Sequence, residues 1–174
     1  MALVKTVRGK TPQFGGHCYL AENATIIGDV VMGDHCSLWF NTVIRGDVNS
    51  IRIGNRVNIQ DGAVLHCSYE SSVIEIGDHV SVGHNVIIHG AQISGYVLIG
   101  MGAILMDHVA IGENAIIAAG ALLLKDTVVE PNSVYGGVPA KKIKTVDPGQ
   151  TREMIHQTAE RYLMYARWYQ ADDT

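Results

Sequence analysis

Residues 93–122 read ISGYVL IGMGAI LMDHVA IGENAI IAAGAL, consecutive blocks of six that each begin with isoleucine or leucine. The fifth residue of every block is small or β-branched: Val97, Ala103, Val109, Ala115 and Ala121. A period of six fits neither an α-helix, which repeats every ~3.6 residues, nor a plain strand, which alternates every two. It is typical of short strands joined by corners and wound into a parallel β-helix, with the aliphatic residue filling the interior.

The same repeat continues outward in both directions, with aliphatic positions at 20–44, 53–65, 76–88 and 93–135. Its register slips three times: residues are added around 48–50 and 67–75, and one is missing near 90–92. Such slips predict loops or bulges, which often carry function. The repeat resembles the left-handed, three-sided kind of β-helix, and the handedness comes from that resemblance alone. Three blocks per turn predict about six turns, or a prism ~30 Å long at ~4.8 Å per turn.

The pattern changes after Val146, so the chain divides into a hexapeptide-repeat β-helix domain at 1–146 and a C-terminal helix at 147–174. Asp147 is a predicted N-cap, Pro148 suits the first helical position, and Gln150 could complete a capping box. One helical stripe then contains Ile155, Ala159, Tyr162, Ala166 and Tyr169. We expect an all-β fold with this helix packed along the prism.

Composition excludes several classes of protein. The chain has 174 residues, 47% of them hydrophobic, and 17 acidic against 13 basic groups, a net charge of −4. This balance argues against disorder, and the lack of a basic cluster argues against nucleic-acid or membrane partners. No apolar run is long enough to span a membrane, and no signal peptide is recognisable. Three cysteines without a framework spacing favour a reducing, cytoplasmic location.

Three of the eight histidines have positions in the repeat that indicate a site. His66 and His89 occupy the second place of blocks one full turn apart, so they are predicted to stack ~5 Å apart on adjacent turns. Arg45 holds the same place one turn before His66. His84 lies in the third place of another block, one face away, and Asp61 lies below it in the same column.

A prism corner separates His84 from the pair within one chain. A three-fold arrangement of chains would bring His84 of one chain to His66 and His89 of its neighbour. Three imidazoles with an open fourth position are the pattern of a catalytic zinc site. The alternative from spacing alone is three unconnected surface histidines.

Further motifs give the chain a family resemblance. They are Arg45-Gly46-Asp47, Asn58-Ile59-Gln60-Asp61, His66, the run from Gly83-His84 to His89, and Gly137-Val138-Pro139-Ala140-Lys141. In this combination the chain resembles the gamma-class carbonic anhydrases and their close bacterial homologues over essentially its whole length. The repeat by itself would be shared with many acyltransferases.

The resemblance implies a lyase that reversibly hydrates carbon dioxide to bicarbonate by means of a metal-bound hydroxide. It implies a homotrimer in which His66 and His89 of one chain and His84 of its neighbour bind Zn²⁺, with Fe²⁺ or Co²⁺ as alternatives. The substrates would be carbon dioxide and bicarbonate, bound between subunits.

The resemblance also implies roles for six other residues. Arg45 would pair with Asp47 or Asp61 across the subunit boundary, and Gln60 would hydrogen-bond the metal-bound water or bicarbonate. Asn58 would support the site from behind. Tyr162 matches an active-site tyrosine of the family, although packing against the prism is an equally good explanation.

Two other functions remain open from the sequence. One is a hexapeptide-type acyltransferase using coenzyme A, which is disfavoured because the matched histidines converge on one another instead of on a carboxylate. The other is a catalytically weak, metal-binding scaffold trimer. The short loop at 67–75 supports it, because Glu70 and Glu75 are the only acidic residues there to export protons.

Overall fold

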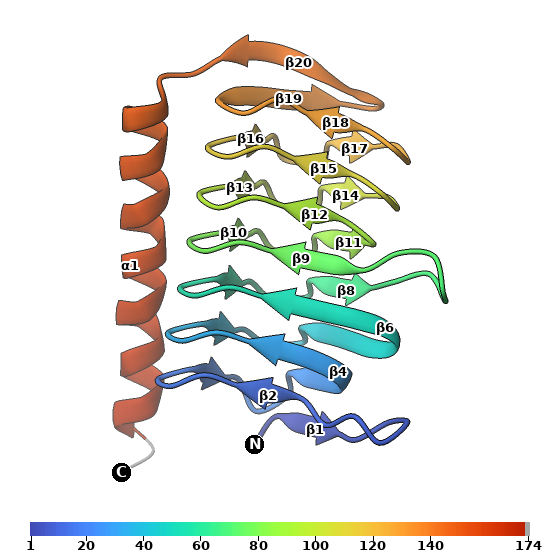
Figure 1. The fold of residues 1–174 in the computed structure, drawn as a ribbon. Helices are drawn as coiled ribbons and strands as arrows, with labels where there is room; N and C mark the ends of the chain where they lie inside the picture. Colours follow the sequence, from blue (N-terminus) through green and yellow to red (C-terminus); the bar gives the residue numbers. More distant parts are fainter. Residues whose placement is uncertain (173–174) are drawn as a thin grey trace.

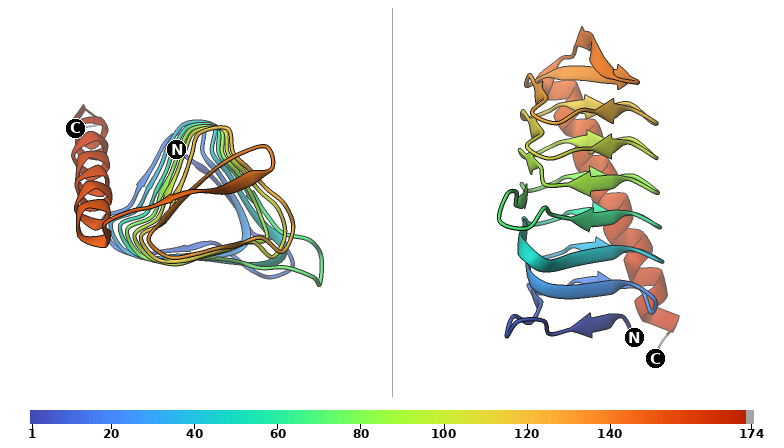
Figure 2. Two further views of the ribbon diagram at one scale, coloured as in Figure 1. Left: turned by 90° about the horizontal axis from the view of Figure 1, so that it is seen from above. Right: turned by 90° about the vertical axis from the view of Figure 1, so that its right-hand side faces the viewer.

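The chain winds into a left-handed parallel β-helix of about seven turns, with one long helix beside it (Figure 1). The computed structural model describes residues 1–172, and side chains through residue 170. Seen from above, each turn is a triangle (Figure 2). The expected fold class is confirmed.

The three sides of the triangle are stacks of parallel strands, here called faces 1, 2 and 3. Face 1 contains β1 (Leu3–Lys5), the first parts of β4 (Thr25–Met32) and β6 (Val43–Ile53), β8 (Val64–His66), β11 (Ile87–His89), β14 (Ile104–Leu105) and β17 (Leu122–Leu123). Face 2 contains β2 (Gln13–Phe14), the later parts of β4 and β6, β9 (Ile74–Ile76), β12 (Gln92–Ile93), β15 (Ala110–Ile111) and β18 (Val128–Val129). Face 3 contains β3 (Tyr19–Leu20), β5 (Ser37–Leu38), β7 (Asn58–Ile59), β10 (Ser81–Val82), β13 (Leu98–Ile99), β16 (Ile116–Ile117) and β19 (Ser133–Gly137), to which β20 (Ala140–Thr145) pairs antiparallel.

The aliphatic position of each block points into the prism, as the repeat predicts. On face 1, Leu65 pairs with Ile88, and Ile88 with Leu105 on the next turn. These side chains are fully buried in one continuous core. Every turn places an aliphatic side chain at the same position on each face. Burial of this apolar surface therefore fixes the register of the whole stack.

The structure has one turn more than the expected six. The added turn comes from residues before Leu20, where the six-residue pattern is absent. β1 pairs with β4 along Thr25–Ile27, and β2 pairs with β4 at Val31 and Met32. The predicted number of turns was too low because β1 and β2 pair with β4 through their backbones, and such pairing does not require the six-residue repeat.

The register slips are corner irregularities, as predicted. β6 runs round the corner between faces 1 and 2: Gly28 pairs with Gly46, but Val30 pairs with Ile51, so β6 carries the extra residues there. The segment at 67–73 leaves the same edge of the prism as a projecting loop, drawn in green in Figure 2.

Helix α1 (Pro148–Asp172) runs along the prism beside face 3 (Figure 1). The predicted N-cap is confirmed, because Gln150 N donates to Asp147 Oδ1 at 2.8 Å. Ile155, Ala159 and Ala166 of the predicted stripe are buried. Within the described residues no helix is both long enough and apolar enough to cross a membrane.

Charged and aromatic contacts complete the docking of α1. Arg56, at a corner between faces 2 and 3, forms an ion pair with Glu160. Two turns further along the same corner, the Arg152 guanidinium lies 4.0 Å from the centre of the Tyr96 ring. The helix is therefore held to the prism by polar contacts at its edge as well as by its apolar stripe.

We expect His79 to make this docking sensitive to pH. Its ring stacks on Tyr96 at 4.6 Å and lies 5.5 Å from the His156 ring of α1. Its Nδ1 atom is buried and has no hydrogen-bond partner among the described residues. Burial, with nearby His156 and Arg56, lowers the pKa of His79 below its ordinary 6.5. Between pH 6.5 and the lowered pKa, His79 binds a proton in the unfolded chain but not in the folded one. The free energy of unfolding is therefore highest above pH 6.5, and this contribution is lost as the pH falls through the lowered pKa.

We expect the free energy of unfolding to decline below pH 6.5, and to decline less steeply in His79→Asn, because asparagine does not titrate and tolerates the left-handed corner. Denaturant titrations of both proteins at a fixed chain concentration, across that pH range, measure the difference. Equal slopes for the two proteins would contradict the prediction.

Candidate metal centre

Two histidines stack on adjacent turns of face 1. His66 ends β8 and His89 ends β11, and the two are register partners in the parallel ladder. Their ring centres are 5.5 Å apart and the rings are inclined at 61°. Arg45 is the partner of His66 on the preceding turn. The predicted Arg45–His66–His89 column is therefore present.

Asp47 links Arg45 to His66 within the same chain. Its Oδ2 atom accepts a hydrogen bond from Arg45 Nη1 at 2.8 Å, and its Oδ1 atom lies 3.1 Å from His66 Nε2. Burial acts to raise the pKa of Asp47, but the bonds from Arg45 and His66 outweigh it and lower that pKa. Burial lowers the pKa of His66, which favours the neutral imidazole that a metal requires. We call Arg45, Asp47, His66 and His89 the pair half-site.

His84 lies at the opposite edge of face 1, on the corner that follows β10. Its Nδ1 atom is 2.9 Å from Asp61 Oδ2, which confirms the predicted neighbourhood of these two residues. The His84 side chain is 41% exposed. Within residues 1–172 of one chain, no cluster of three histidine, cysteine or acidic residues is arranged to hold a metal ion. One chain thus presents a pair of imidazoles at one edge and a single imidazole at the other.

Asn58 and Gln60 lie at the end of face 3, one turn before β10, and both are buried. Gln60 Nε2 donates to Asn58 Oδ1 at 3.0 Å, and Asn58 Nδ2 donates to Ser81 Oγ at 2.7 Å. This chain of bonds fixes the orientation of the Gln60 amide. Asn58 therefore holds the Gln60 side chain in place through this hydrogen bond.

Tyr162 comes from helix α1 and packs against the prism beside His84. Its ring packs edge-on against Trp39 at 5.5 Å, and it lines a cavity of about 310 Å³ together with Asp61 and His84. Burial, then the charge of Asp61, raises the pKa of Tyr162 to about 12, so the phenol stays protonated near neutral pH. We call Asn58, Gln60, Asp61, His84 and Tyr162 the His84 half-site.

The sequence reasoning missed one residue of the candidate site, Asp107. Asp107 Oδ2 lies 3.3 Å from His89 Nδ1, so all three histidines have a carboxylate partner. The available signal was its position in the repeat, one turn beyond Gly90, which directly follows His89. The aspartate is otherwise indistinguishable from the many acidic residues at corners.

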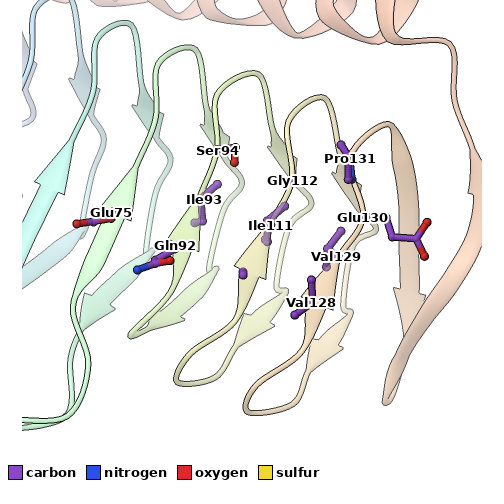
Figure 3. Close-up of a pocket in the computed structure, with 11 residues that line it drawn as sticks. Glu75, Gln92, Ile93, Ser94, Ile111, Gly112, Val128, Val129, Glu130 and Pro131 are labelled. Atoms are coloured by element: carbon purple, nitrogen blue, oxygen red, sulfur yellow. The ribbon is translucent and has the colours of Figure 1, made fainter.

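A larger cavity of about 510 Å³ lies elsewhere, over face 2 (Figure 3). It is lined by Gln92, Ala110 and Val128 on the outward side of the strands, with Glu75 and Glu130 nearby. None of the predicted site residues lines it. Cavity size therefore does not identify the candidate site in this chain.

Comparisons with known proteins agree with the motifs. A family described as "Bacterial transferase hexapeptide (six repeats)" matches residues 90–125. A protein of Geobacillus kaustophilus named "Carbonic anhydrase" is 44% identical over 97% of this chain and 92% of its own length. The chain belongs to the gamma-class carbonic anhydrase-like family.

A second relative has the gamma carbonic anhydrase name, and a similar solved structure has a different one. Gamma carbonic anhydrase 2, mitochondrial, of Arabidopsis thaliana is 35% identical over 95% of the chain, which spans 61% of that protein. A crystal structure from Bacillus cereus, named as a candidate acetyltransferase, superposes with a TM-score of 0.91 at 39% identity and covers 98% of both chains. The relatives that are named carbonic anhydrase confirm the expected carbonic anhydrase-like enzyme.

Proposed function

We propose that this chain is a metal-dependent carbonic anhydrase that hydrates carbon dioxide reversibly to bicarbonate at sites between three identical subunits. The observation that carries the proposal is the division of three carboxylate-partnered histidines between opposite edges of face 1. A three-fold ring would place the His84 half-site of each chain against the pair half-site of its neighbour.

The donor set fits a divalent metal such as Zn²⁺, with Fe²⁺ or Co²⁺ as alternatives. Each imidazole uses one ring nitrogen for a carboxylate, which leaves the other nitrogen for a ligand. Metal-binding histidines in proteins have this arrangement, because the carboxylate fixes the ring and raises its basicity. Three neutral imidazoles leave the fourth position of a tetrahedral metal open.

The surface between the half-sites suits contact with a second copy. Face 1 presents Val64, Ile87 and Ile104 outward on consecutive turns, each more than a third exposed. Met106 and Leu124 continue the His66–His89 column and are also exposed. Exposed apolar side chains gathered on one face are typical of an interaction surface, and here they lie directly beside the candidate ligands.

The chain's own residues would then hold the metal ligands in place and contact the bicarbonate. When bound, the metal supplies the Lewis acidity that brings the pKa of a coordinated water to ~7. Asp47 and Asp61 hold the rings of His66 and His84 in place, and Arg45 holds Asp47. Gln60, oriented by Asn58, offers its amide to the bicarbonate oxygens, and the protonated Tyr162 hydroxyl closes the aromatic side of the pocket.

Metal content and activity measured on one sample test this proposal. Protein purified without oxygen is analysed for metals and assayed for carbon dioxide hydration by stopped flow. We expect about one metal ion per chain, loss of activity on chelation, and recovery on adding Zn²⁺, Fe²⁺ or Co²⁺.

Two outcomes would contradict the proposal. Acetyl-coenzyme A turnover without metal would favour the acyltransferase, in line with the name given to the similar Bacillus cereus structure. Bound metal without either activity would favour the scaffold trimer.

A further inference from the structure

A small hydrogen-bond network surrounds Asp107 at the corner between faces 1 and 2. Ser72 Oγ donates to Asp107 Oδ1 at 2.5 Å, and Ser68 Oγ donates to Asp107 Oδ2 at 3.0 Å. The same Oδ2 atom is 3.3 Å from His89 Nδ1. Both carboxylate oxygens are thus engaged, and among the described residues no lysine or arginine pairs with this aspartate.

The projecting loop is folded so as to present these serines. Ser68 N donates to Ser72 Oγ at 3.0 Å, and Ser72 N donates to Ser68 O at 3.3 Å. Gly90, which follows His89, has a φ of +70°, and a Cβ atom there would collide with Ser72 Oγ and Asp107 Oδ1. The backbone after His89 therefore leaves room for the network.

We infer that Asp107, braced by Ser68 and Ser72, is the positioning residue that orients His89 for metal binding. This inference rests on the proposed function for the identity of His89 as a ligand. In this arrangement the Asp107 carboxylate accepts a hydrogen bond from His89 Nδ1–H, which leaves the lone pair on Nε2 directed away from the corner. The loop at 67–73 thereby acts as a support for the ligand shell.

The test compares three variants with the wild-type chain. Asp107→Ala removes the acceptor, and Ser72→Ala weakens the brace with little risk to the fold. Asp126→Asn is the matched control: Asp126 lies at an exposed corner one turn above, where its backbone N–H donates to Asp107 O. Trimer mass and unfolding midpoint are recorded for each variant.

The first readout is the tautomer of His89 in metal-free protein, followed by ¹⁵N NMR of histidine side chains and assigned with His89→Gln. The second is the affinity for added Co²⁺, read from its visible absorption. We expect Asp107→Ala to lose the Nδ1–H tautomer and to bind Co²⁺ ~10–100-fold more weakly. Ser72→Ala should shift both readouts in the same direction by a smaller amount, and Asp126→Asn should shift neither.

The two readouts separate this inference from the proposed function. Suppose that Asp107→Ala changes the His89 tautomer but the wild-type protein binds no Co²⁺. That result would support the orienting contact and overturn the metal site. An unchanged tautomer, or a changed tautomer with unchanged Co²⁺ affinity, would overturn the role of Asp107.

Discussion

Replacing His84 by alanine is expected to reduce carbon dioxide hydration to the uncatalysed background, without breaking the trimer. The reason is that each proposed site takes its third imidazole from His84 of a neighbouring chain, and two imidazoles hold a metal far more weakly than three. His84 stands on an exposed corner and contributes nothing to the core, so the fold should survive. Metal analysis, stopped-flow assay and sedimentation of the same sample measure all three properties.

Mixing inactive variants gives this prediction a sharper form. His84→Ala chains keep an intact pair half-site, and His89→Ala chains keep an intact His84 half-site. After unfolding and refolding an equal mixture, each mixed trimer should contain one complete site. Random assembly then restores about a quarter of the wild-type sites and activity. If the mixture is as inactive as its components, the histidines do not meet across a subunit boundary.

Ile87→Asp is expected to have the second large effect. Ile87 is outward on β11, between His84 and His89 on the same turn, and is 41% exposed in the single chain. In a trimer that closes on face 1, its carboxylate would be buried without a partner at a cost of several kcal/mol. We expect monomers by sedimentation, loss of bound metal and loss of activity, with the β-helix retained by circular dichroism.

Val128→Asp is the matched control for this surface. Val128 is also an outward aliphatic residue on a short strand, but it lies on face 2 and is 69% exposed. Its substitution should leave the trimer and the metal content unchanged. A trimer that tolerates Ile87→Asp equally well would show that face 1 is not the subunit interface.

The periodic part of the structure was predictable because one simple rule governs it. The aliphatic residues at sixth positions from Ile26 to Val129 are buried, so counting along the sequence places His66 directly beside His89 without any coordinates. The same counting puts His84 and Asp61 in one column, and their side chains are 2.9 Å apart. Helix α1 followed from its cap and its apolar stripe.

The rest depended on contacts that the period does not encode. The first turn pairs through its backbone, and the sequence at Leu3–Lys5 carries no six-residue signal. Asp107 reaches His89 through a corner whose shape is set by Gly90 and by a loop inserted between blocks. Arg45 bonds to Asp47 inside one chain, because the two side chains lie two residues apart on β6. The pairing across a subunit boundary that the resemblance implied stays a prediction.

The reversed strand β20 ends the stack of strands on face 3. A stack of parallel strands ends in a row of unpaired N–H and C=O groups, onto which another chain could add and extend a fibril. Here β20 covers β19 in the opposite direction and brings Lys141, Lys142 and Lys144 to the new edge. A β20 strand from a second copy would meet like charges at this edge, so we expect the cap to oppose amyloid-like growth from face 3.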